Sequence, residues 1–309
     1  MSQLLAGAGP YTIVKSWEID GTPDAGVNTV TIGIVDGNGD TIISAGTATT
    51  DNNDGTYDYV LADQPLPDQL TVTWTRTDTS ADLIDRIELV GNWLFIESQA
   101  RGFQAKADAT SALKPLNSAT EYPDAILAAE RLRIQDDLES WTGRSWVPRY
   151  CRVELNGNGS RILPLGGIAR TSDGYALNRS GRWADIAVIL TVTINGTLQT
   201  ASDYTFDPIG SNIVSKVGPF RVGTVSTPYN VVVEYVYGLP TIVDGVDRIA
   251  MKLLVDRLVP SSFPDRALSV DTDFGTTRFV QPGGPMNNVS RVPEVNEWVR
   301  SHYNRLPIS

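Results

Sequence analysis

One stretch, residues 120–143 (TEYPDAILAAERLRIQDDLESWTG), constrains the fold more than any other part of the chain. Pro123 stands where a first-turn proline is tolerated, because its missing N–H would be unpaired there anyway. Gly143 is a residue type that often ends a helix. Apolar residues recur between them with the period of one helix face, at Leu127, Ile134, Leu138 and Trp141. The pattern predicts a helix over 123–141 that begins a unit separate from the β-rich residues before it.

Composition narrows the class of protein. A chain of 309 residues is long enough for about two domains without disulfide staples. Its net charge of −11 argues against a protein that grips nucleic acid by neutralising phosphates. Cys151 is the only cysteine, which fits a reducing compartment. No apolar run reaches the roughly 18 residues of a membrane span, and a signal-peptide pattern is missing, so we expect assembly in the cytoplasm.

Residues 11–80 carry the signals of a small antiparallel β-sandwich. Turns rich in residues that tolerate positive φ separate its expected strands, at 30–35, 41–43, 57–61 and 70–74. Residues 1–10 are predicted to be a flexible tail that orders on contact with a neighbour. The DGNGD turn at 36–40 has two interpretations, a hairpin turn or a calcium loop. Thr41 and Thr47 stand where an EF-hand needs glycine and glutamate.

The rest of the chain reads as a hinge followed by an α+β unit. Residues 81–119 are interpreted as a linker with a helical part, since residues 84–101 fit either a strand or the start of a helix. The predicted order after the 123–141 helix is a β unit over 150–238, a helix at 245–258, an irregular loop at 261–291, and a C-terminal helix and tail at 293–309. The expected fold class is multidomain α+β: an N-terminal antiparallel β-sandwich plus a helical core carrying a small β-sheet or barrel insertion.

No motif for enzymatic chemistry stands out. His302 is the only histidine, and it is interpreted as a solvated or interface side chain rather than a ligand or catalyst. Cys151 begins a predicted strand and is interpreted as a packed residue. The stretches GAGP, LNGNGS and LPLGGIA lack the form and the strand-to-helix context of phosphate loops. The sequence therefore predicts no catalytic residue, no metal site and no cofactor.

A patch of arginine and tryptophan follows the helix. Arginine and aromatic side chains are enriched at protein interfaces. The alternative is that these arginines pair with the acidic residues of the helix, where Asp136, Asp137 and Glu139 are interpreted as a solvated or intersubunit face. The patch consists of Arg144, Arg149, Arg152 and Arg161 with Trp141 and Trp146.

The order of these parts resembles the head-to-tail adaptor proteins (connectors, or head-completion proteins) of long-tailed bacteriophages, especially those of actinobacterial hosts. The likeness covers about residues 85–309, with an extra N-terminal β domain. It rests on YPDAILAAERLRIQDDLESWTGRSW, VTINGTLQTASDYTFDP, VVVEYVYGLP, GVDRIAMKLLVDRLVPSSFPDRA, DTDFGTTRFVQPGGP and VPEVNEWVRSHYN.

The resemblance implies a structural virion protein without enzymatic activity. Such adaptors form a ring, usually of twelve copies, under the portal at the neck of the virion. Their partners are the portal, a downstream stopper or tail-completion protein, and genomic DNA that passes through the lumen without sequence-specific binding. The resemblance makes the C-terminal segment the candidate portal-binding element, with Val292, Pro293, Val295, Trp298, Tyr303, Arg305 and Leu306. Candidate intersubunit residues are Arg131, Asp136, Arg144, Trp146 and Arg149.

A second hypothesis is a virion β-domain protein of the tail, baseplate or capsid surface that binds a host surface or glycan. Aromatic residues of the N-terminal domain could form a sugar-binding platform or the core of the sandwich; they are Trp17, Tyr57, Tyr59 and Trp74. A third class, a virion hydrolase, lacks any motif. An acidic lumen would repel DNA phosphates and help the DNA to slide, which the charge of −11 favours.

Overall fold

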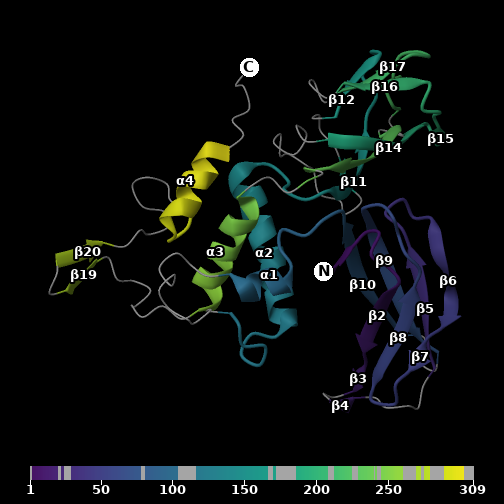
Figure 1. The fold of residues 1–309 in the computed structure, drawn as a ribbon. Coiled ribbons are helices and arrows are strands. Elements are labelled where there is room, and N and C mark those ends of the chain that lie inside the picture. The colour runs from purple at the N-terminus through teal and green to yellow at the C-terminus, as the bar shows by residue number, and fades with distance from the viewer. Residues whose placement is uncertain are drawn as a thin grey trace. The chain divides into compact units, whose positions relative to one another are not determined.

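The computed structural model of the chain (Figure 1) describes residues 2–19, 22–23, 29–77, 81–103, 116–165, 170–171, 186–207, 212–224, 229–239, 241, 245–259, 269–272, 275–278 and 289–302. The chain is a mixed α+β protein with several sheets and, within these ranges, four helices. It groups into a β-rich unit, Met1–Asn92 with Val147–Pro240, and a helical unit, Trp93–Trp146 with Thr241–Ser309. The domain boundaries predicted from the sequence differ from this grouping and stay a prediction.

The first part of the β-rich unit is a sandwich of two sheets. Its strands are β1 (Ser2–Leu5), β2 (Tyr11–Ser16), β5 (Val30–Val35), β6 (Thr41–Ala48), β7 (Thr50–Asp51), β8 (Thr56–Leu61), β9 (Asp68–Arg76) and β10 (Ala81–Val90), with a small pair β3 (Glu18–Ile19) and β4 (Thr22–Pro23) beside them in the sequence. The larger sheet has the order β1-β10-β9-β5-β6, and the smaller has the order β2-β8-β7. The pairs within both sheets are antiparallel except β1 with β10, which is parallel.

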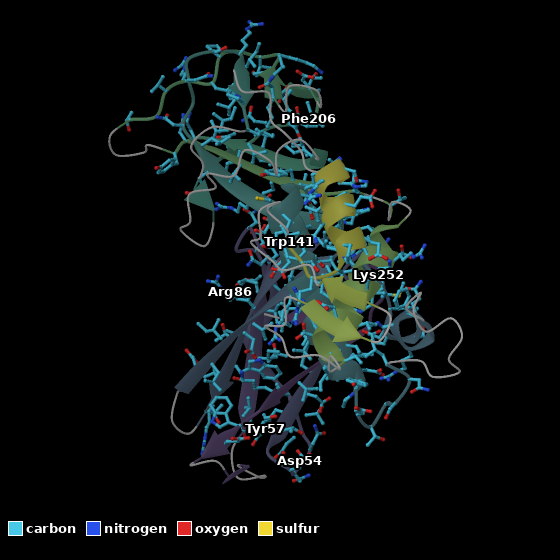
Figure 2. All side chains as sticks on the ribbon, turned by 90° about the vertical axis from the view of Figure 1, so that its left-hand side faces the viewer. Asp54, Tyr57, Arg86, Trp141, Phe206 and Lys252 are labelled. Atoms are coloured by element: carbon cyan, nitrogen blue, oxygen red, sulfur yellow. The ribbon has the colours of Figure 1, made fainter. Side chains whose placement is uncertain are left out.

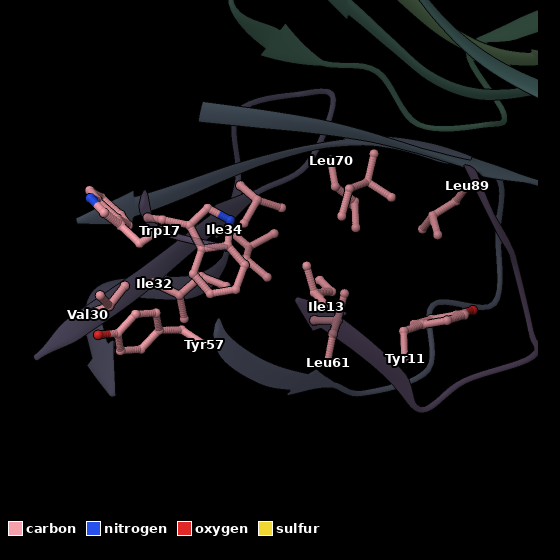
Figure 3. Close-up of a cluster of buried hydrophobic side chains, with 13 residues drawn as sticks. Tyr11, Ile13, Trp17, Val30, Ile32, Ile34, Tyr57, Leu61, Leu70 and Leu89 are labelled. Atoms are coloured by element: carbon pink, nitrogen blue, oxygen red, sulfur yellow. The ribbon is translucent and has the colours of Figure 1, made fainter. Parts of the chain in front are cut away.

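Alternation of apolar and polar residues holds the two sheets together. Leu70, Val72 and Trp74 alternate along β9 and have no exposed surface. Side chains from the smaller sheet, among them Tyr57 and Leu61, complete one core with them (Figure 3). Period-two burial of this kind fixes the register of each strand, because a slip by one residue would turn its apolar side chains to solvent.

A second pair of sheets makes up the rest of the β-rich unit. Its strands are β11 (Arg149–Leu155), β12 (Ile162–Pro164), β13 (Arg170–Thr171), β14 (Ile186–Ile194), β15 (Thr197–Leu198), β16 (Tyr204–Asp207), β17 (Asn212–Ser215) and β18 (Val231–Tyr237). The sheet orders are β13-β11-β18-β14-β15 and β12-β17-β16, and both sheets contribute to one core around Val153, Phe220 and Val233. Asn195 (φ 50°) and Gly196 (φ 75°) form the predicted tight turn between β14 and β15.

The helical unit contains α1 (Glu97–Gly102), α2 (Asp124–Thr142), α3 (Val246–Leu258), α4 (Pro293–His302) and a hairpin of β19 (Ser269–Thr272) with β20 (Gly275–Arg278). The helix predicted over 123–141 is α2. It packs against the three other helices, with Leu127, Ile134 and Leu138 fully buried. Gly143 ends it in the left-handed conformation (φ 71°) and donates its N–H to the carbonyl of Glu139.

Three segments differ from the sequence-based expectation. Residues 2–5, expected in a flexible tail, form β1, because Leu4 packs on the sandwich core and the strand finds a partner in β10. Residues 81–90, expected in the hinge, are the long strand β10. The loop expected at 261–291 contains the β19–β20 hairpin. The DGNGD turn joins the antiparallel strands β5 and β6, so its interpretation as a hairpin turn is confirmed.

Candidate interaction surfaces

Ion pairs tie the three long helices of the helical unit together. Arg257 on α3 bonds to Asp137 on α2 and lies 3.6 Å from a carboxylate oxygen of Glu130. Lys252 on α3 (Figure 2) donates to Glu294 in the first turn of α4, at 2.9 Å. The predicted acidic face of α2 is therefore partly used inside the unit, while Asp136 remains exposed.

Arg131 is a buried cation. Only 5% of it is exposed, and its Nη1 donates to the carbonyl of Phe95 (3.0 Å) and to Glu97 Oε1 (2.7 Å). Its guanidinium carbon lies 3.9 Å from the ring centre of Trp93, a cation–π contact. Burial lowers the pKa of Arg131, and Glu97 offsets part of that effect. Arg131 therefore has almost no surface for a neighbouring subunit, in contrast to its predicted intersubunit role.

The C-terminal helix is held by an aromatic cluster. The ring of Trp298 stacks on His302 (4.3 Å between centroids) and lies 4.7 Å from Trp146. Trp146 is 1% exposed and donates its indole N–H to Thr142 Oγ1. Trp146 therefore fixes α4 on the end of α2. Its side chain has little exposed surface left for the predicted contact with a neighbouring subunit. His302 also bonds through Nδ1 to the carbonyl of Trp298 (2.9 Å).

Asn296 is the polar anchor of the same helix. The side chain is buried, and its Oδ1 accepts the backbone N–H groups of Val289 (2.8 Å) and Ser290 (3.0 Å). Its Nδ2 donates to the carbonyls of Ser290 (2.8 Å) and Val292 (3.2 Å). One amide therefore satisfies four backbone groups around the first turn of α4. No sequence pattern marks Asn296, since a lone asparagine in a helix has no distinctive spacing.

The described part of the candidate portal-binding segment divides between core and surface. Val295 is fully buried among the helices, Pro293 is exposed, and Val292 and Trp298 are half-buried. Tyr303, Arg305 and Leu306 lie outside the described residues. Among the described members of this set, Pro293 and the exposed parts of Val292 and Trp298 are the surface that can meet a partner.

The remaining predicted intersubunit residues have partners within their own units. The guanidinium of Arg144 lies 5.7 Å from the ring centre of Trp146. Arg149, on β11, forms a two-pronged ion pair with Glu88 on β10, with Nη2 3.0 Å from Oε2. Gln3 Nε2 donates to the same carboxylate (2.7 Å). Arg149 thus joins the sandwich to the second pair of sheets, which favours pairing over an exposed interface for this arginine.

The aromatic residues proposed as a sugar platform belong to the sandwich core. Trp17, Tyr57 and Trp74 are 8%, 1% and 0% exposed, and Tyr59 packs partly buried against them. A platform needs ring faces open to solvent. Trp17, Tyr57 and Trp74 therefore expose too little ring surface for such a platform, which leaves the glycan-binding hypothesis with the half-buried Tyr59.

An acidic cluster surrounds the Tyr150 phenol in the β-rich unit. The phenol donates to Glu234 Oε1 (2.6 Å), and the backbone of Gly37 presses against the ring so closely that a Cβ there would lie 2.3 Å from it. Asp68 accepts the backbone N–H groups of Gln69 (2.7 Å) and Gly37 (3.2 Å). Burial, and then the Glu234 carboxylate, raises the pKa of Tyr150, so the phenol stays a hydrogen-bond donor.

Desolvation is the main cause that raises the pKa of Asp68 to about 6, and the charges of Asp36 and Glu234 add to it. The folded state therefore binds a proton that the unfolded chain, with an ordinary value of 3.8, releases at lower pH. The stability that this proton contributes is complete below about pH 4 and is lost as the pH rises through 6. We expect Asp68→Asn, which keeps the Oδ1 acceptor, to stabilise the protein at pH 8.

Asp68→Asn should gain about 1–2 kcal/mol at pH 8, after discounting the full pKa difference for solvent screening. The gain should vanish near pH 4. Thermal unfolding of both proteins across this range measures it. Asp54→Asn, on an exposed turn, is the comparison of opposite sign: hydrogen bonds from Thr56 lower the pKa of Asp54, so its replacement should cost stability at pH 8 instead of adding it. A gain for Asp68→Asn that is the same at pH 4 and pH 8 would contradict the assigned ionisation.

Metal-ligand clusters and membrane-spanning helices are both missing from the described part of the chain. Within them, no group of three or more His, Cys, Asp or Glu side chains is placed to hold a metal ion. No described helix combines the length and apolar character needed to span a bilayer. A scan against protein-family models and a search of curated proteins found no match for the chain.

Proposed function

We propose that this chain is a head-to-tail adaptor, a structural protein that forms a ring under the portal of a bacteriophage capsid, extends the DNA channel and offers a surface for the tail. The observation that carries the proposal is the packing of α2 against α3 and α4. Val147–Pro240 leaves the helical unit after α2 and returns before α3. This helix, β insertion, helix and C-terminal segment repeat the order of parts in the adaptors that the sequence resembles.

The proposed portal-binding element is the C-terminal segment from Val292 onward. Support comes from the way α4 is built, with Val295 and Asn296 holding it on the helical unit while Pro293 faces solvent. The aromatic cluster of Trp146, Trp298 and His302 fixes the last turn of α4. In this proposal α4 is the base, and Tyr303, Arg305 and Leu306 are the contacts with the portal.

The proposal predicts a ring-on-ring complex. Mixing the purified chain with a purified portal should give a second ring under the portal that is visible by negative-stain electron microscopy. A chain shortened after His302 should keep its helical circular dichroism and lose the second ring. Pro240→Ala, a substitution outside α4 and the C-terminal segment, is the control: it should still form the second ring after the same purification. A full-length chain that stays off the portal at every ratio tested would refute the adaptor function.

The acidic composition adds a testable property of the channel. Net negative charge on a lumen wall repels phosphates, so DNA slides without binding. Retention of short duplex DNA by the assembled ring should stay undetectable even at low salt, where a basic lumen would bind strongly. Retention that falls steeply as salt is raised would contradict the proposed acidic lumen.

A further inference from the structure

The β19–β20 hairpin is a sheet of two strands, and no third described strand joins it. Its four residue pairs run from Ser269↔Arg278 to Thr272↔Gly275, and among the described residues both strands pair only with each other. A two-stranded hairpin of this size is marginally stable by itself in water. Its outer backbone groups gain hydrogen bonds when a further strand edge lies beside them. The hairpin therefore has outer backbone edges that no described strand covers.

The sandwich offers a regular edge of suitable length. Residues 81–86 of β10 pair with β9 in unbroken register, and on the other side β1 covers only Ile87–Val90. Among the described strands, none pairs with that open stretch. The outer edges of β6 and β14 are less suitable, because each has register shifts against its neighbour and such irregularities hinder strand addition.

A groove runs along the same edge. It has a volume of about 670 Å³ and is lined by residues 13–15 of β2 and 84–87 of β10. Ile13 and Ile87 are buried at its base, while Val14 (55% exposed) and Ile84 (65% exposed) leave apolar surface beside it. Lys15 reaches across to Asp85 (2.9 Å), so this pair adds no net charge. The groove combines an open backbone edge with apolar surface, the two features that β-strand addition uses.

We propose that the β19–β20 hairpin of one copy of this chain adds to the β10 edge, beside residues 81–86, of a second copy. The four-residue strands fit the six-residue edge. β1 sets the precedent, since it already adds to the rest of this edge.

The choice of a second copy as the partner rests on the proposed function, a ring in which each chain has an identical neighbour on either side. A hairpin on one surface that meets an edge on another makes a head-to-tail contact, which can close into a ring. The hairpin thereby becomes the device that links subunits, and the N-terminal sandwich becomes the surface that receives it.

Cysteine cross-linking tests the proposal in the full-length chain with Cys151→Ser as background. One protein carries Ile84→Cys, another carries Thr277→Cys, and the two are mixed, free and on the portal, with a short bismaleimide. The mixture should give cross-linked dimers, each protein alone should not, and a chain with both substitutions should give a ladder of dimers and higher species. Val60→Cys replaces Ile84→Cys as the control, because Val60 is similarly exposed (56%) but lies on β8, between β2 and β7.

Each outcome decides one way. Val270→Cys can replace Thr277→Cys as the cysteine on the hairpin. Adding Thr277→Pro to that protein should remove its cross-link to Ile84→Cys, because proline disrupts strand pairing. A cross-link only within single chains, or between two Ile84→Cys proteins, overturns the head-to-tail pairing. Rings on the portal without a cross-link overturn the hairpin contact and leave the adaptor function standing. Cross-linked ladders from a chain that does not bind the portal overturn the adaptor function and leave the hairpin contact standing.

Discussion

Glu88→Ala is expected to lower the free energy of unfolding of the β-rich unit by about 3 kcal/mol, near the lower end of the range for breaking a buried ion pair. The Glu88 and Arg149 side chains are 9% and 13% exposed. Alanine would leave the guanidinium inside the unit without its carboxylate, and Gln3 would lose the acceptor for its Nε2. Hydrogen exchange of peptides from β10 and β11 measures the loss locally, which matters because a chain with two units does not guarantee a single unfolding transition.

Glu154→Ala is the matched control for Glu88→Ala. Glu154 also pairs with an arginine, Arg152, but its side chain is 31% exposed, so its loss should cost at most about 1 kcal/mol. A chain with Glu88→Met and Arg149→Met should recover most of the stability, because two apolar side chains leave no buried charge. Equal losses for Glu88→Ala and Glu154→Ala would show that the Glu88 pair contributes little to holding the sandwich to β11.

Local patterns predicted the secondary structure well where one signal dominates. The α2 helix, the strong strands β14 and β18, and the Asn195-Gly196 turn follow from periodicity and turn chemistry in neighbouring residues. The prediction of a flexible tail was wrong for residues 2–5, and the choice between strand and helix after residue 84 stayed open, because β1 and Ile87–Val90 of β10 pair with each other although 85 positions separate Ser2 from Ile87. No local pattern contains that pairing.

The candidate interaction residues were harder to predict than the elements. Arg131 and Trp146 have the composition of an interface, and the same chemistry that suits an interface also suits a buried helix junction. What decides between the two is which partner lies within reach: Trp93 for Arg131, and Trp298 for Trp146. Trp93 lies 38 positions before Arg131 and Trp298 lies 152 positions after Trp146, so periodicity carries no information about either contact.

Arg131→Ala is the second change with a large expected effect, a loss of about 3 kcal/mol in the helical unit. It removes the bond to Phe95, the ion pair to Glu97 and the stacking on Trp93, and it opens a void beside α2. Arg131→Lys should recover only part of the stability, because an ammonium lacks the flat face that stacks on Trp93 while the guanidinium Nη1 donates to Phe95 and Glu97. Hydrogen exchange of α2 amides and the mobility of the free chain on gel filtration are the measurements.

Arg133→Ala separates the two roles that Arg131 could have. Arg133 lies two residues further along α2 with 71% of its side chain exposed and pairs with Glu130, so its removal should cost at most about 0.5 kcal/mol. If Arg131 acts inside the unit, Arg131→Ala accelerates exchange in α2 of the free chain, before any subunit contact exists. Unchanged exchange together with a lost ring on the portal would instead assign Arg131 to the contact between subunits, as the sequence alone predicted.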